Sequence, residues 1–177
     1  MVNRLIDLFV SFLHLFRAWE IIDEYERGVR LRFGKLYNGA LLPGFHWRIP
    51  FGVDKILTEN VTRTTTALSP QALTTKDGVG VVVSGIVTWR ICDIVKFLIK
   101  VEEAKEILAD VTRGVIRQLV AAHTWDEISY KGEQFDDELF KKARTPAFQW
   151  GVEVLKVSLS DVAKCRSLRL LGTWTED

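Results

Sequence analysis

An apolar stretch near the N-terminus, Leu5–Phe16, constrains this chain more than any other feature. No Gly or Pro interrupts it, so the stretch is predicted to be a helix. Its few polar neighbours follow one another at steps of three or four positions, which places them in one narrow stripe on that helix. They are Arg4, Asp7, Ser11 and His14. The rest of the helix surface is therefore left to Leu, Ile, Val and Phe side chains.

Several locations for this helix compete. A helix that spans a bilayer needs about 20 apolar residues, and Arg17 ends this stretch too early. A secretory signal peptide is disfavoured by the polar residues inside the apolar core and by the lack of a small-residue cleavage site. Packing inside the protein's own core is disfavoured by the width of the apolar surface. The sequence favours an interfacial or shallowly inserted helix with Trp19 at the membrane boundary.

Composition excludes one class of partner. The 177 residues include 24 Lys and Arg against 23 Asp and Glu, a net charge of +1. Proteins that neutralise nucleic-acid phosphates usually carry a basic surplus, so we expect no nucleic-acid partner. Cys92 and Cys165 are too isolated to form a metal knuckle or a disulfide framework, and we expect both thiols to be buried in a reducing compartment.

Strand patterns dominate the first half of the chain. Alternating apolar and polar residues predict strands over Tyr25–Phe33, which Gly34 ends, and over Val79–Ile91. A threonine-rich run predicts another strand over Thr58–Leu68. Asn38–Gly39 is typical of a tight turn.

The segment Leu41–Phe51 has neither a helical nor a strand period, and two prolines and a glycine predict a loop. It nevertheless carries Phe45, Trp47, Ile49 and Phe51. A loop this apolar either packs beneath the domain or lies on a membrane surface, and the residues alone leave both open.

Helical periodicity replaces the strand pattern from Glu102 to Val120. Thr124 and Glu127 predict a capping box at the start of a second helix. Three further elements are expected: a helix over residues 135–150 that Pro146 should end or kink, a strand over 152–159, and a short C-terminal helix over 162–171. Strands first, helices next and a returning strand predict the α+β class.

The residues give no sign of catalysis. His14, His46 and His123 share no metal-ligand spacing, and the sequence contains neither a phosphate-binding glycine loop nor a nucleophile elbow. We therefore expect no enzyme activity, no metal and no cofactor.

Five segments, taken in order, resemble the SPFH or Band 7 domain of stomatins, prohibitins, flotillins and the bacterial proteins that surround a membrane AAA protease. They are Glu26–Lys35, Leu42–Phe51, Leu73–Val79, Ile116–Val120 and Trp150–Val154. The resemblance implies a mixed, largely antiparallel sheet with packed helices behind an N-terminal membrane helix. It also implies non-enzymatic proteins that form rings or cages and organise or confine membrane proteins and lipids. The Phe45–Trp47 loop resembles the family's membrane-facing loop, which favours lipid contact.

The resemblance suggests four parts of the chain. They are a hydrophobic membrane helix at 1–22, a β-rich first SPFH subdomain at 23–72, a second α/β subdomain with a short C-terminal helix at 73–171, and a tail at 172–177. Family members usually continue into a long Ala/Glu-rich helix that builds coiled-coil walls, whereas this sequence stops at Asp177. We therefore expect a short form that assembles through the sides of the domain rather than a large closed cage.

These observations predict a membrane-associated scaffold that forms a homo-oligomeric ring in a membrane microdomain. The alternative is a regulatory adaptor or inhibitor of one membrane protein, such as a protease or channel. Basic residues after the apolar stretch outnumber Arg4 before it, which favours a domain on the cytoplasmic side. The residues expected to contact membrane lipids are Leu5, Ile6, Leu8, Phe9, Phe12, Leu13, Phe16, Trp19, Phe45, Trp47 and Phe51.

Overall fold

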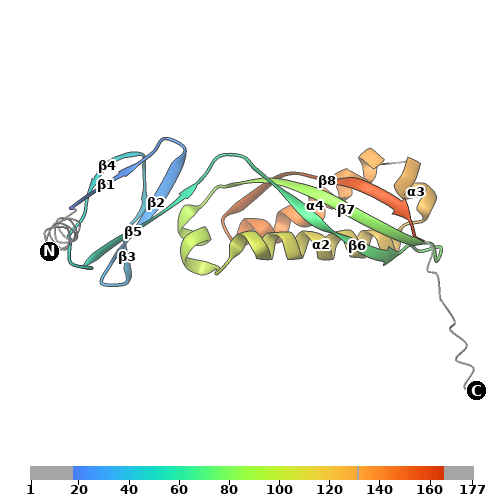
Figure 1. Ribbon diagram of the computed structural model, residues 1–177, viewed down its shortest axis with the longest axis horizontal. Coiled ribbons are helices and arrows are strands. Elements are labelled where there is room, and N and C mark those ends of the chain that lie inside the picture. Colours follow the sequence, from blue (N-terminus) through green and yellow to red (C-terminus); the bar gives the residue numbers. More distant parts are fainter. Residues whose placement is uncertain (1–17, 131, 166–177) are drawn as a thin grey trace, which may run out of the picture. The chain divides into compact units, whose positions relative to one another are not determined.

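The computed structural model describes residues 18–130 and 132–165 (Figure 1). The strands are β1 (Trp19–Ile22), β2 (Glu26–Arg32), β3 (Lys35–Leu41), β4 (Gly44–Trp47), β5 (Asp54–Asn60), β6 (Thr64–Thr74), β7 (Gly80–Ile91) and β8 (Val152–Lys164). The helices are a short π-helix η1 (Lys96–Lys100), α2 (Ala104–Ala122), α3 (Trp125–Tyr130) and α4 (Gly132–Gln149). This mixture of sheets and helices confirms the α+β class.

The chain divides into two compact units that interleave along the sequence. Among the described residues, the first unit holds 18–64, 89–104 and 146–153, and the second holds 65–88, 105–145 and 154–165. In the first unit β1 pairs with β4, and β2 lies between β3 and β5. All of these pairings are antiparallel.

The β2–β3 hairpin corrects one expectation about turns. The chain reverses at Phe33–Gly34, since Arg32 pairs directly with Lys35. Asn38 and Gly39, the expected turn, instead form a bulge inside β3. Both pairs of residues have the positive φ angles that a two-residue hairpin turn requires, so local sequence does not decide which pair reverses the chain. The pairing register with β2 decides it.

Two further expectations about the first unit are wrong. Gly44–Trp47 is not a loop but strand β4, and Trp19–Ile22 is not part of a helix over 1–22 but strand β1. The two strands stabilise each other through ladder hydrogen bonds, and they come from segments far apart in the sequence. A periodicity search along one segment does not detect such a pairing. The stretch Leu5–Phe16 lies outside the described residues.

In the second unit, α2 and α4 run along one face of the β6–β7–β8 sheet (Figure 1). The core contains alternate residues of β7 and the apolar sides of both helices: Val81, Val83, Val87, Leu108, Ile116, Leu119, Leu139 and Ala143. Gly85 allows close packing against both the neighbouring strand β8 and helix α2, because a Cβ there would lie 3.0 Å from the Ser158 carbonyl oxygen and 3.3 Å from Ile116 Cδ1.

Several predicted elements are confirmed in this part of the chain. The strand over Val79–Ile91 and the helix from Glu102 correspond to β7 and α2. The capping box also forms, since Thr124 N–H donates to Glu127 Oε2 at 3.0 Å and Glu127 N–H donates to Thr124 Oγ1 at 3.4 Å. It opens α3.

Three predicted elements differ. The single strand over Thr58–Leu68 is two strands, β5 and β6, because the chain leaves the first sheet after Asn60. The predicted helix over 135–150 is confirmed as α4, but Pro146 does not end it, because a proline in the last turn removes only one backbone hydrogen bond. The described part of the expected C-terminal helix, residues 162–164, is strand, because β8 continues to Lys164.

Candidate membrane-binding surface

An exposed apolar face lies on the β1–β4 ribbon of the first unit. Trp19 lies directly opposite Trp47, and Ile21 lies directly opposite Phe45. Because alternate residues of a strand share a face, and opposite residues of a pair share it too, the four side chains form one surface. They are 47% (Trp19), 63% (Trp47), 61% (Ile21) and 61% (Phe45) exposed. We call these four residues the aromatic face.

The side chains of the aromatic face lie together on one side of the ribbon. The rings of Phe45 and Trp47 are tilted against each other with centroids 6.2 Å apart. Ile22, which follows Ile21 at the end of β1, is buried. The ribbon therefore presents an apolar side to solvent, the reverse of the usual polar outer face of a sheet, while its other side carries the buried Ile22 and the half-buried Glu20 and His46.

The loop after β4 continues the apolar surface. Ile49 is 41% and Phe51 is 61% exposed. The Arg48 N–H donates to the carbonyl oxygen of Ala18 at 2.8 Å, so this loop begins beside the point where the described chain starts. Phe51 therefore belongs to the same end of the unit as the aromatic face.

The buried side chain of Asp54 holds this loop in place through hydrogen bonds. Its carboxylate is buried and accepts hydrogen bonds from the Arg32 guanidinium at 2.8 and 3.0 Å and from the Ile49 N–H at 3.0 Å. The Arg32 hydrogen bond and charge lower the pKa of Asp54 from 3.8 to about 2. A carboxylate that is charged at neutral pH thus ties the loop to β2.

The structure places the expected contact residues in two groups. Trp19, Phe45, Trp47 and Phe51 are all exposed in the first unit. The other seven, Leu5, Ile6, Leu8, Phe9, Phe12, Leu13 and Phe16, lie outside the described residues. Sequence reasoning missed Ile21 because it assigned that position to a helix, although the spacing of Trp19 and Ile21 matches that of Phe45 and Trp47.

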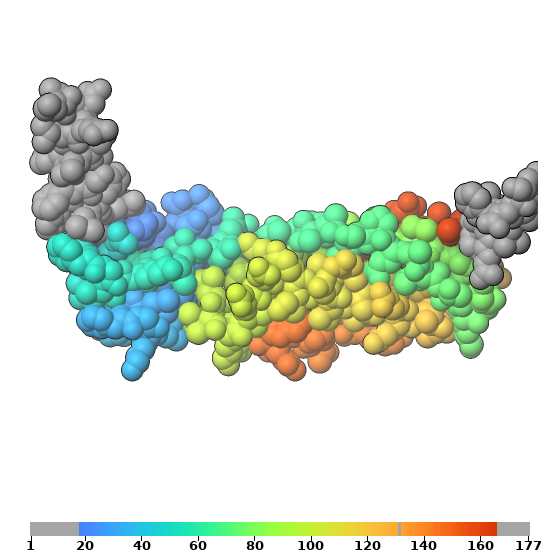
Figure 2. All heavy atoms as spheres, turned by 60° about the horizontal axis from the view of Figure 1, so that its bottom comes forward, coloured from blue at the N-terminus to red at the C-terminus, as the bar shows by residue number. Residues whose placement is uncertain are grey.

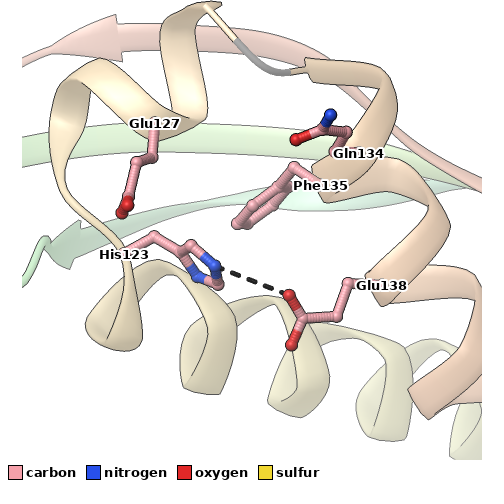
Figure 3. A pocket seen from close by; sticks show the side chains of 5 residues that line it. All are labelled: His123, Glu127, Gln134, Phe135 and Glu138. Carbon is pink, nitrogen blue, oxygen red and sulfur yellow. Dashed lines mark ion pairs between the residues drawn. The ribbon is translucent and has the colours of Figure 1, made fainter.

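A small pocket in the second unit is lined by several titratable groups (Figure 3). His123 Nδ1 lies 2.9 Å from the Leu119 carbonyl oxygen, and Nε2 lies 3.5 Å from Glu138 Oε2. The ring meets Phe135 edge-on, with centroids 5.4 Å apart. At about 150 Å³ the pocket is smaller than typical ligand sites of roughly 300–1,000 Å³. Its contacts join the end of α2 to α4, which is a structural role.

The described residues include no cluster of metal ligands and two exposed thiols. Residues 18–130 and 132–165 contain no group of three or more His, Cys, Asp or Glu side chains that could hold a metal ion. The expectation that both thiols are buried is wrong, since Cys92 and Cys165 are exposed. Each follows the last residue of a strand, where the chain leaves the sheet.

None of the described helices is long and apolar enough to cross a bilayer.

Comparison with known proteins defines the class. Residues 20–168 match the family model described as "SPFH domain / Band 7 family". The chain belongs to the SPFH domain or Band 7 family, as the five sequence segments indicated. Proteins of this family are membrane-associated scaffolds or regulators and are generally non-enzymatic.

Named relatives come from archaea, bacteria and animals. An uncharacterised protein of Methanocaldococcus jannaschii is 27% identical over 153 residues, which cover 86% of this chain and 76% of that protein. Protein HflK of Haemophilus influenzae is 32% identical over 140 residues, 77% of this chain and 34% of HflK. Stomatin-4 of Caenorhabditis elegans is 26% identical over 162 residues, 91% of this chain and 57% of stomatin-4. The chain thus spans only part of HflK and of stomatin-4.

Proposed function

We propose that this protein is a non-enzymatic membrane scaffold that self-assembles into a ring and organises or confines membrane proteins or lipids. The apolar stretch Leu5–Phe16 and the aromatic face hold it to one leaflet, with the domain on the cytoplasmic side. The observation that carries the proposal is the aromatic face itself, whose four apolar side chains point into solvent from one two-stranded ribbon.

The energetics of burial support membrane contact. Moving a large apolar side chain fully out of water is worth about 1.5–3 kcal/mol. The members of the aromatic face are already partly covered, so each contributes on the order of 1 kcal/mol on entering the interface. Trp also prefers the headgroup region, where one end of the ring is apolar and the other is hydrated. Together these side chains add a second attachment point to the apolar stretch.

The edges of the second sheet support self-assembly. β6 is an edge strand of eleven residues with no charged side chain, although charged side chains are a common protection of such edges. The other edge strand, β8, is partly blocked, since Leu159 N–H donates to Asp136 Oδ1 of α4 at 3.2 Å. Burial raises the pKa of Asp136. Pro70, which has no backbone N–H, divides β6 into two shorter pairing segments. We assign the edge of β6 to contacts between subunits.

The alternative is a regulatory partner of one membrane protein, such as a protease or a channel. The similarity to HflK keeps this alternative open. It predicts a complex of fixed stoichiometry with that membrane protein and no self-assembly.

Membrane attachment is tested by flotation with lipid vesicles. A deletion of residues 1–17 leaves β1 intact, and we expect it to weaken vesicle binding strongly. Adding Phe45→Thr and Trp47→Thr, which keep β-propensity, should lower the remaining binding by about tenfold or more. The matched control, Tyr130→Thr with Phe148→Thr, removes two exposed aromatic side chains elsewhere and should have no effect. Unchanged flotation of the fully substituted deletion variant would refute membrane attachment by these features.

Ring assembly is tested by mass photometry of the full chain extracted in mild detergent. One large species of many subunits supports the ring. Monomers or dimers refute a homo-oligomeric ring and favour the adaptor. Crosslinking in membranes would then identify the partner of that adaptor.

A further inference from the structure

Two turns of the first unit hold phenylalanine in an unusual conformation. Phe33 has a φ of 50° and is followed by Gly34 at 75°, and Phe51 has a φ of 64° and is followed by Gly52 at 77°. Left-handed φ angles favour Gly, Asn and Asp, and a bulky side chain there is an outlier. Phe33 is also 77% exposed, so burial of its ring within the described unit does not compensate for the strain.

The two turns lie side by side. Phe33 N–H donates to the Val53 carbonyl oxygen at 2.8 Å, and Arg32 pairs with Asp54 in the register of β2 and β5. Both Phe–Gly turns therefore belong to one end of the β3–β2–β5 sheet. We call this end, residues 30–36 and 48–55, the Phe–Gly tip. Light-blue atoms of the β2–β3 hairpin project from the first unit in the space-filling view (Figure 2).

Charge is distributed unevenly along this sheet. The Phe–Gly tip carries five cationic residues and one carboxylate, Asp54, which already pairs with Arg32. The cations are Arg30, Arg32, Lys35, Arg48 and Lys55. Lys35 and Lys55 are exposed, and neither forms an ion pair with another described residue. They lie on the two strands that flank β2, one on each side of the Phe33 turn.

The opposite end of the same sheet is acidic. There the pairing joins Glu26 to Asn60 and Arg27 to Glu59. The preceding turn adds Asp23 and Glu24, so this end carries four carboxylates against Arg27, with Arg63 three positions beyond Asn60. An anionic surface would attract the Phe–Gly tip and repel the far end, which sets an orientation as well as an affinity.

The described part of the chain begins beside the Phe–Gly tip. The Arg48 N–H of the Phe–Gly tip donates to the Ala18 carbonyl oxygen, and the apolar stretch ends at Phe16, two positions before Ala18. A membrane that holds this stretch is therefore within reach of the tip.

We propose that the Phe–Gly tip binds an anionic lipid leaflet. The rings of Phe33 and Phe51 enter the boundary between headgroups and acyl chains, while Lys35 and Lys55 contact headgroup phosphates and carboxylates. The strain at Phe33 is the cost of presenting an aromatic ring at the end of a rigid hairpin. The inference rests on the proposed membrane function and adds lipid charge and an orientation to it.

The test uses the full chain and two kinds of vesicle, phosphatidylcholine alone and phosphatidylcholine with a third replaced by phosphatidylserine. We expect tighter binding to the anionic vesicles, and we expect added salt to reduce the difference. Lys35→Gln with Lys55→Gln should remove roughly tenfold or more of the binding to anionic vesicles and little of the binding to neutral ones. Lys141→Gln with Lys156→Gln is the matched control, because it removes the same charge from exposed sites of the second unit.

Phe33→Asn separates insertion from folding. Asn tolerates the left-handed conformation, so the turn should keep or gain stability while vesicle affinity falls several-fold. Equal binding of the unsubstituted protein to both vesicles, or equal behaviour of the two lysine double variants, overturns the inference but leaves membrane attachment standing. Failure to bind either vesicle refutes the proposed function itself. A Phe33→Asn variant with normal vesicle affinity but smaller oligomers would make the tip a contact between protein chains, which also overturns the inference.

Discussion

Arg32 and Asp54 face each other across β2 and β5 and join through two hydrogen bonds, Nε to Oδ1 at 2.8 Å and Nη2 to Oδ2 at 3.0 Å. The same carboxylate accepts from the Ile49 N–H. One ion pair therefore holds both the sheet and the loop that presents Ile49 and Phe51. Parallel hydrogen bonds of this kind are among the stronger polar contacts in proteins.

Substituting Asp54→Asn should lower the free energy of unfolding by roughly 1–3 kcal/mol at pH 7, since it leaves a partly buried guanidinium without its charge partner. The pKa of Asp54 is about 2 in the folded protein against 3.8 otherwise. Its contribution is therefore present above about pH 4 and is lost as the pH falls toward 2. Urea unfolding across this range should show a shallower pH dependence in the variant. Asp126→Asn, at an exposed site, is the control, and a variant with an undiminished pH dependence would contradict this role of Asp54.

Gly151 and Gly114 should respond to alanine in opposite directions. Gly151 has a φ of 77°, and a Cβ there would lie 2.3 Å from the Asp93 carbonyl oxygen. Gly151→Ala should lower the free energy of unfolding by roughly 2–4 kcal/mol through backbone strain and steric clash. A Cβ at Gly114, inside α2, would meet nothing within 4 Å, so Gly114→Ala should raise it by up to about 1 kcal/mol. Denaturant titrations that gave both variants the same sign would contradict this interpretation.

Charges placed along β6 should disrupt assembly without unfolding the domain. Ala67 and Ala72 are exposed on this uncharged edge strand, and lysine beside an open edge opposes pairing with another strand. Ala67→Lys with Ala72→Lys should shift the mass distribution of the extracted protein toward monomers while circular dichroism stays unchanged. Gln118→Lys, at an exposed position of α2, should leave the mass distribution intact. Full-sized oligomers in the double variant would place the subunit contact elsewhere.

Much of the second unit could be predicted from sequence because its signals are local. The alternation before Ile91, the helical period after Glu102 and the Thr124–Glu127 capping box each depend on neighbours a few positions apart. The errors share a different cause. The positions of Asn38–Gly39 and of Trp19–Ile22 depended on which distant strand paired with them, and pairing partners leave little trace in one segment.

The residues predicted to contact the membrane show the same division. Phe45, Trp47 and Phe51 were identified from apolarity in a segment rich in turn residues, and all three are exposed. Ile21 and Phe33 were not identified. The first shares a surface with Phe45 only through the β1–β4 register, and the second became notable only through its left-handed backbone and its exposure.

The sequence by itself determined the family, the α+β class, the apolar stretch Leu5–Phe16 and the balance of charge. Each follows from residue types and short spacings, which folding does not alter. The tertiary structure decided which apolar residues share a surface and where charge accumulates. Strand register brought Trp19 to Trp47 and Arg32 to Asp54, and it separated the basic Phe–Gly tip from the acidic end near Glu26. Register is a long-range property, because hydrogen bonds between strands join residues that composition and periodicity treat as unrelated.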